Sequence, residues 1–167
     1  MNIKLMRFFG LVLCSVLISQ THLFPGLAPG TKILTAAGPV LIEELKVGGT
    51  ITGYNPAENS FPEVVIKEIV SNPAESAYII KTDRGTICAS ADQIFYDVVH
   101  NDFIKTEHLE VGTVFLTKDL KENICIGVER NDIPATVYDI TLDEPHLFFS
   151  SDACVLTHNF VAAFPAL

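Results

Sequence analysis

Positively charged residues are scarce in this chain. Its 167 residues include 11 Lys and Arg against 20 Asp and Glu, so the formal net charge is -9 with His neutral. Proteins that bind nucleic acids or anionic membranes present a basic stripe, often interleaved with aromatic residues, and this chain has neither. We therefore expect no nucleic-acid binding, and membrane contact only through the N-terminal segment.

Cysteine is also scarce, with four residues in the chain. Beyond the N-terminal segment Cys88, Cys125 and Cys154 remain, and an odd number cannot form a closed disulfide framework. No two of them have metal-ligand spacing, so we expect no metal site. Each lies in an apolar run, which favours small buried core residues. One disulfide stays open in an oxidising compartment.

Helical periodicity is missing as well, since no segment keeps the spacing of an amphipathic helix over three turns. With 49% hydrophobic residues the chain can nevertheless bury a core, which excludes disorder. Short β-branched runs separated by Gly, Pro, Asn and Asp predict an all-β domain. Turns are expected at Asn72-Pro73, Asp83-Arg84-Gly85 and Asp143-Glu144-Pro145. The expected strands cover residues 32–35, 39–42, 50–55, 63–71, 77–82, 86–90, 94–99, 102–105, 113–117, 124–130, 136–142, 146–150 and 154–157.

The N-terminus carries Lys4 and Arg7, followed by an apolar run over residues 8–18. A basic flank before an apolar run too short to span a bilayer comfortably is typical of a secretory signal. No small-x-small cleavage site follows, and Cys14 stands after a bulky residue, unlike the cysteine of a lipoprotein signal. We expect residues 1–25 to be a signal peptide or signal anchor, and the protein to be exported, secreted or anchored.

Two pairs of segments repeat within the chain. EELKVGGTI at 43–51 matches EHLEVGTVF at 107–115, and YIIKTDRGTICAS at 78–90 matches YDITLDEPHLFFS at 138–150. The pairs occur in the same order in each half of the chain. Chance similarity between β-rich segments explains one pair, but two pairs in order favour a duplicated β unit. We predict one domain of two intertwined halves related by a pseudo-two-fold axis.

The chain ends shortly after a His-Asn pair, His158 and Asn159. The side-chain amide of an Asn can attack its own backbone carbonyl, which closes a succinimide and cuts the chain. A neighbouring His is a natural proton donor to the leaving amide nitrogen. By itself, however, such a pair is a weak signal and is more typical of a polar loop near a terminus.

The His158-Asn159 pair belongs to a longer pattern at the two ends of the domain. This pattern consists of the opening segment GLAPGTKILTAAGPVLIEELKVGGTI and the closing segment VYDITLDEPHLFFSSDACVLTHN. With the duplication, they resemble the Hint (hedgehog/intein) domain family, and most of all the bacterial type found ahead of the toxin in polymorphic toxin proteins. The resemblance covers residues 26–159 and leaves 160–167 as a short tail. It implies a Hint-type intertwined β fold that processes its own chain by acyl shifts, without a cofactor.

The resemblance also implies that the first catalytic step is lost. The family's N-terminal Cys or Ser nucleophile falls on Gly26, which has no side chain. Its Thr-x-x-His motif falls on SADQ, where Ser90 keeps a hydroxyl but Gln93 cannot act as an acid or base near neutral pH. Splicing further requires Cys, Ser or Thr after Asn159, where this chain has Phe160. Splicing is therefore excluded on chemical grounds.

The residue types that the family uses for cleavage at the C-terminal end of the domain are all present. His146 matches an upstream His of the family that activates the Asn or steadies the tetrahedral intermediate. With His158 and Asn159, it leaves at most one self-cleavage after Asn159, which would release FVAAFPAL. The alternative is a catalytically inert secreted β-module with a binding or structural role and an unknown protein partner. An enzyme for an external substrate has little support, because no Ser-His-Asp spacing or paired carboxylates stand out.

Overall fold

A computed structural model describes residues 25–159, and these residues form an all-β domain. The expected all-β class is confirmed, since the described part contains no α-helix. Two 3-10 helices, η1 at Ile42–Glu44 and η2 at Thr106–His108, are its only helical turns. The strands are β1 Lys32–Thr35, β2 Gly38–Leu41, β3 Thr50–Thr52, β4 Glu63–Ala74, β5 Ala77–Thr82, β6 Gly85–Ala89, β7 Ile94–Asp97, β8 Asp102–Lys105, β9 Val114–Leu116, β10 Glu122–Asn131, β11 Ala135–Leu142, β12 Leu147–Ser150 and β13 Val155–His158.

Every expected strand has a counterpart, but one expected turn is wrong. Asn72 and Pro73 lie inside β4, which continues to Ala74 and pairs with β11 throughout. The other edge of β4 pairs with β3 only over Glu63–Val65. At Pro73 the strand thus has a single partner, and such a position tolerates the missing N–H of proline. The chain turns after Ala74 instead.

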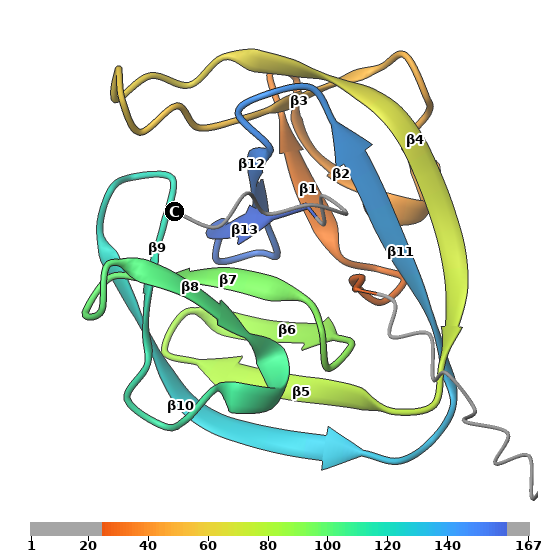
Figure 1. Ribbon diagram of the computed structural model, residues 1–167, viewed down its shortest axis with the longest axis vertical. Helices are drawn as coiled ribbons and strands as arrows, with labels where there is room; N and C mark the ends of the chain where they lie inside the picture. The colour runs from red at the N-terminus through yellow and green to blue at the C-terminus, as the bar shows by residue number, and fades with distance from the viewer. Residues whose placement is uncertain (1–24, 160–167) are drawn as a thin grey trace, which may run out of the picture.

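The strands form two curved sheets (Figure 1). The larger sheet has the order β2-β1-β12-β13-β7-β9-β10-β5-β6, with β8 paired to β7, and the smaller has the order β11-β4-β3. In Figure 1 the long pairs β4–β11 and β10–β5 run along two sides of the molecule, with β1, β12 and β13 between them. The C-terminal hairpin is therefore central in the fold.

The first repeat predicted from the sequence occupies equivalent places in the two halves. Each copy is a 3-10 turn followed by a left-handed glycine, Gly48 with φ 83° and Gly112 with φ 99°. The Gly48 N–H donates to the carbonyl oxygen of Ile66, and the Gly112 N–H to that of Cys125, each at 2.8 Å. Glycine is needed at both positions because other L-residues are strained there.

The second repeat shows that the halves exchange strands. Tyr78 in β5 pairs with Arg130 in β10, whereas the matching Tyr138 in β11 pairs with Ser71 in β4. Each half thus supplies the partner for the other half's long strand. This reciprocal pairing agrees with two intertwined halves related by a pseudo-two-fold axis.

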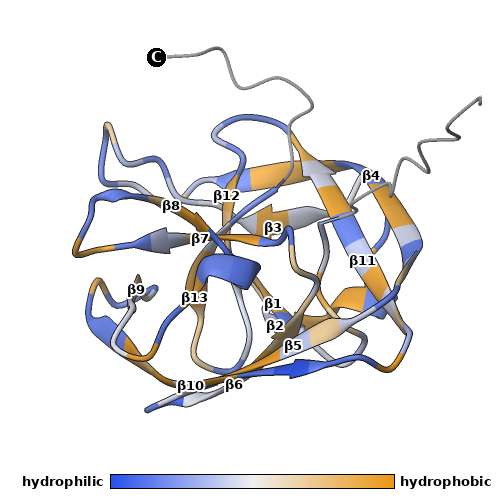
Figure 2. Cartoon of the chain, turned by 60° about the horizontal axis from the view of Figure 1, so that its bottom comes forward, coloured by the Kyte–Doolittle hydropathy of each residue, from blue (hydrophilic) through white to orange (hydrophobic). Residues whose placement is uncertain are grey.

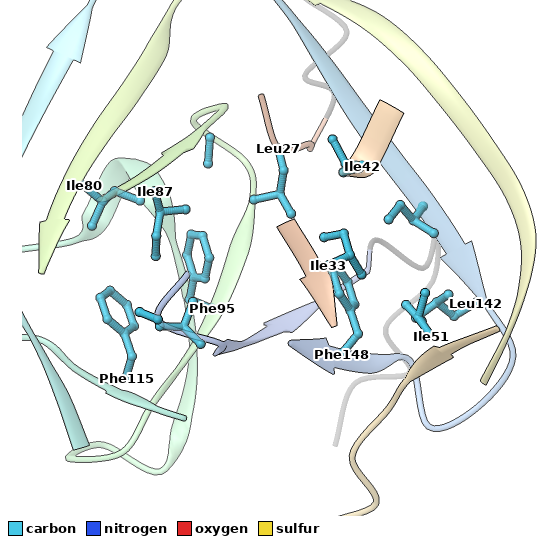
Figure 3. Packing of buried hydrophobic residues seen from close by; sticks show 14 of the residues in the cluster. Leu27, Ile33, Ile42, Ile51, Ile80, Ile87, Phe95, Phe115, Leu142 and Phe148 are labelled. Carbon is cyan, nitrogen blue, oxygen red and sulfur yellow. The ribbon is translucent and has the colours of Figure 1, made fainter. Parts of the chain in front are cut away.

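The hydrophobic core also combines residues of both halves (Figure 3). Ile80 and Ile87 of the first half pack beside Phe95 and Phe115, and Leu142 of the second half lies near Ile51. Leu27 lies between these two groups and forms β-bridges to both Tyr138 and Ala89. The core is thus shared between the halves.

Polar and apolar residues interleave along the long strands β4 and β11, as Figure 2 shows. This period-two pattern is the expected one for strands with one buried and one solvated face. A second, smaller buried cluster of Tyr54, Leu147, Phe149 and Leu156 packs on the C-terminal hairpin. Within residues 25–159, no helix is long and apolar enough to cross a membrane.

Candidate functional site

The end of β13 carries His158 and Asn159 into the interior of the larger sheet. His158 pairs with Leu147 of β12 on one side and with Ile94 of β7 on the other. The next backbone N–H, that of Asn159, donates to the carbonyl oxygen of His146 at 3.1 Å. The β12–β13 hairpin thus brings His146, His158 and Asn159 together.

Asn159 is buried, with 2% of its surface exposed. With its amide nitrogen facing His146, Nδ2 donates to the His146 carbonyl oxygen at 2.8 Å and Oδ1 accepts from the backbone N–H of Leu142 at 3.1 Å. The side chain is therefore fixed at both ends. Fixed geometry is the main requirement of an intramolecular attack.

His158 places Nδ1 within hydrogen-bonding reach of the Asn159 carbonyl oxygen. The pKa of His158 is lowered, mainly by burial and to a smaller extent by the neighbouring His146, although the hydrogen bond with Asn159 acts in the raising direction, so the imidazole is neutral near pH 7. A neutral imidazole can make this contact only with its proton on Nδ1, because two acceptors would repel. The ring is thus placed to polarise the carbonyl that Asn159 would attack.

His146 is not in a strand, although the sequence placed it at the start of one. It precedes β12 with φ 63°, a left-handed conformation that is costly for a residue with a side chain. Its Nδ1 is buried without a hydrogen-bond partner, and its ring centroid lies 6.4 Å from that of His158. A buried imidazole nitrogen without a partner is rare outside functional sites.

Gln93 joins the two ends of the site through its side chain. It is 4% exposed, and Nε2 donates to the carbonyl oxygens of His158 at 3.0 Å and of Ile94 at 3.2 Å. Its backbone N–H donates to the Ser90 carbonyl oxygen at 3.3 Å. Gln93 therefore fastens β13 to the segment that contains Ser90.

Gly26 lies on the other side of Ser90, whose backbone N–H donates to the Gly26 carbonyl oxygen at 2.9 Å. The Ser90 hydroxyl is buried without a hydrogen-bond partner. A Cβ atom on residue 26 would lie 2.9 Å from both the Tyr138 carbonyl oxygen and the Val137 Cβ. Residue 26 thus has no room for a side chain unless its neighbours shift.

Asp139 is a candidate that the sequence reasoning missed. The bridge between Leu27 and Tyr138 is antiparallel, so the next residue, Asp139, stands opposite Gly26. The pKa of Asp139 is raised to about 6, mainly by burial and to a smaller extent by the charge of Glu68, while a hydrogen bond from the Ile140 backbone acts in the lowering direction. Strongly shifted carboxyls are enriched at functional sites. The sequence signal was only the Asp in VYDITL, next to a buried strand position.

The cysteines lie apart from this site and form no disulfide in the part of the chain that the structure describes. Cys125 is buried as expected, whereas Cys88 and Cys154 are only half-buried. A surface cavity of about 370 Å³ includes Cys154, Arg84, Asp119 and Asp152, and none of the predicted site residues. Residues 25–159 contain no group of three or more His, Cys, Asp or Glu side chains placed to hold a metal ion.

Two groups of predictions lie outside the described residues. One concerns residues 1–24, with the signal segment and Cys14, and the other residues 160–167, with Phe160.

The chain is similar in structure to several solved domains. A bacterial intein-like domain from Clostridium thermocellum matches with a TM-score of 0.75 and 26% identity, over 80% of this chain and 98% of that one. A DnaB intein from Synechocystis gives a TM-score of 0.70 and 18% identity, over 82% and 99%. The gp41-1 intein gives 0.67 and 20%, over 81% and 98%. No family model and no curated protein matches the sequence.

These similarities show that the fold is intein-like. They confirm, for the fold, the resemblance to Hint domains found in the sequence. An intein-like fold supports a function related to autoprocessing of the chain itself.

Proposed function

We propose that this protein cuts its own chain once, after Asn159, and that it does not splice. The observation that carries the proposal is the contact between His158 Nδ1 and the carbonyl oxygen of Asn159, made while the Asn159 amide is held in place. The substrate is the protein's own polypeptide, and the reaction needs no cofactor.

In the proposed reaction, Asn159 Nδ2 attacks the Asn159 carbonyl carbon and closes a five-membered ring. His158 stabilises the oxygen on which negative charge develops. The bond to the Phe160 nitrogen then breaks, and that nitrogen takes up a proton as the tail leaves. The proton lost from Nδ2 needs a nearby base, and the unpartnered Nδ1 of His146 is the candidate in this site. The products are a C-terminal succinimide and the peptide FVAAFPAL.

The first half of a splicing reaction is absent for two reasons. Gly26 has no nucleophile and no room for one, because a Cβ there would meet Tyr138 and Val137. Gln93 uses its amide nitrogen to hold main-chain carbonyls and has no proton to exchange near neutral pH. The later transfer to the C-terminal side is missing as well, because Phe160 cannot accept an acyl group. The remaining groups, His146, His158 and Asn159, support only cleavage at the C-terminal end.

We also propose that the protein is exported, with residues 1–25 as a signal peptide or anchor. Lys4, Arg7 and the apolar run behind them support this proposal. We further propose that the protein is related to the bacterial Hint domains found ahead of toxins, and the opening and closing sequence motifs support this proposal.

A second candidate function is an inert β-module with a binding or structural role. One observation favours it: both ends of the Asn159 amide are already hydrogen-bonded, which ties β13 to the end of β11 and to His146. Such bonds also serve a purely structural asparagine.

The test is the intact mass of the purified protein after long incubation from mildly acidic to mildly basic pH. We expect slow loss of residues 160–167, no loss in Asn159→Ala, and slower loss in folded His146→Ala. Asn159→Ala is the matched control because it removes the attacking amide and leaves the peptide bond. If the wild-type chain keeps its own full-length mass throughout, as the control does, the inert module remains as the function.

A further inference from the structure

One aromatic side chain outside the opening and closing sequence motifs contacts the proposed site. Phe103 of β8 lies against His158, with ring centroids 4.9 Å apart and planes at 71°. The sheet explains the contact. β7 lies between β8 and β13: His158 pairs with Ile94 and Phe103 pairs with Tyr96, so the two side chains lie on the same face of the sheet, on opposite sides of β7 and two residues out of register.

The β7–β8 hairpin holds Phe103 firmly. Tyr96 packs edge-on against Phe103 with centroids 5.5 Å apart, and its hydroxyl donates to Asn101 Oδ1 at 2.5 Å. In the turn, Asp97 accepts from the Val99 N–H at 2.9 Å and contacts His100 Nδ1 at 2.6 Å. Phe103 therefore belongs to a hairpin whose turn is stabilised by side-chain hydrogen bonds.

Core packing does not account for Phe103. Its surface is 37% exposed, and it belongs to neither hydrophobic cluster of the described residues. With more than a third of its surface in solvent, Phe103 gains less from burial than a phenylalanine of the core does. Its ring contacts are with Tyr96 and His158.

We infer that Phe103 is a positioning residue for His158, holding the imidazole with Nδ1 on the Asn159 carbonyl oxygen and keeping water from it. An edge-to-face pair restricts rotation of both rings, and rotation of His158 would take Nδ1 away from the carbonyl. The kinetic consequence of the inference rests on the proposed cleavage, whereas the orientation of His158 does not.

The experiment compares Phe103→Ala, Phe103→Leu and Phe103→Tyr in the full chain, with Val99→Ala as the matched control. Val99 is an apolar residue of the same hairpin, 66% exposed. Nitrogen NMR of the His158 ring reports which nitrogen carries the proton and how the ring titrates, and intact mass reports cleavage. Phe103→Leu keeps apolar bulk without a ring, so it serves if Phe103→Ala does not fold.

In the wild type and Phe103→Tyr we expect the proton on Nδ1. In Phe103→Ala and Phe103→Leu we expect a mixture of tautomers, a His158 titration moved up towards an ordinary histidine, and cleavage slowed roughly two- to tenfold. Unchanged His158 tautomer and titration in the folded variants overturn the inference, even if the wild type cleaves. Absence of cleavage in every chain, with a disturbed tautomer in the variants, would defeat the proposed function and leave the positioning role standing.

Discussion

At the scale of single residues, position 26 requires glycine because neighbouring atoms leave no room for a side chain, and not because the backbone needs the conformational freedom of glycine. Its backbone is held to Ser90, and the space around its α-carbon is filled by Tyr138 and Val137. The resemblance in the sequence predicts that Gly26 stands where a nucleophile is missing. Only the structure shows that the surroundings are closed around the missing side chain, because this depends on residues more than a hundred positions away.

We predict that Gly26→Ala destabilises the domain by about 1–3 kcal/mol, as expected when a methyl group is forced into a filled space. Gly127→Ala is the control, because a Cβ there meets only the Lys81 side chain at 3.6 Å. Urea unfolding of both variants measures the difference. Equal stability of Gly26→Ala and the wild type would show that residue 26 has room for a side chain.

Asp139 leads to a prediction about pH. Its folded-state pKa of about 6 is above the ordinary aspartate value of 3.8, so the folded state binds this proton more tightly than the unfolded state. Stability therefore falls as pH rises from about 4 to about 6 and this contribution is constant above that range. Asp139→Asn should remove this dependence and stabilise the protein at pH 7 by roughly 1–2 kcal/mol, after allowance for solvent screening.

Urea unfolding at several pH values measures the Asp139 effect, with the exposed Glu75→Gln as a control of equal charge change. A pH dependence that is the same in Asp139→Asn and in the wild type would contradict the prediction.

At the scale of elements, the turn between β9 and β10 contains an unfavourable residue. Leu120 has φ 56° and is 43% exposed, so it accepts left-handed strain without a compensating burial. We predict that Leu120→Asn stabilises the protein by about 0.5–1 kcal/mol, since Asn tolerates this conformation better. Thermal unfolding measures it, with the exposed Val111→Asn as the control for removing an apolar side chain. A lower melting temperature in Leu120→Asn than in that control would refute it.

Strand positions were predictable from the sequence because alternation and turn residues are local signals. Pro73 was misread because its tolerance depends on which edge of β4 is paired, and no local pattern reveals that. His146 was misread for a similar reason: its left-handed conformation is imposed by the entry into β12. The pairing of His158 with Phe103 was not visible either, since it joins strands through the intervening β7.

At the scale of the whole molecule, neither half completes a sheet alone. The repeat in the sequence predicted two halves, and the reciprocal pairs β4–β11 and β10–β5 show how they are joined. The sequence could not specify which strands are exchanged, because equivalent strands have equivalent patterns. The closed surroundings of Gly26 and the shifted pKa of Asp139 follow from that exchange.

We predict that the domain unfolds in urea as one cooperative unit, because either half would lose its partner strand if the other unfolded. Far-UV circular dichroism and tyrosine fluorescence should give the same midpoint. Leu27→Ala should lower both midpoints together, by about 2–5 kcal/mol in stability, whereas the exposed Val47→Ala should change them little. Separate transitions for the two probes would contradict the prediction.

The exchange of β5 and β11 has a consequence for assembly. A chain carrying only one copy of the repeated unit would leave the edge of its long strand open, and the complementary strand would be the same strand of a second copy. Because the exchange is reciprocal about a two-fold axis, two copies would close on each other and would not extend into a fibre. The full chain is thus the covalent equivalent of a strand-swapped homodimer, in which a concentration-dependent association has become a unimolecular one.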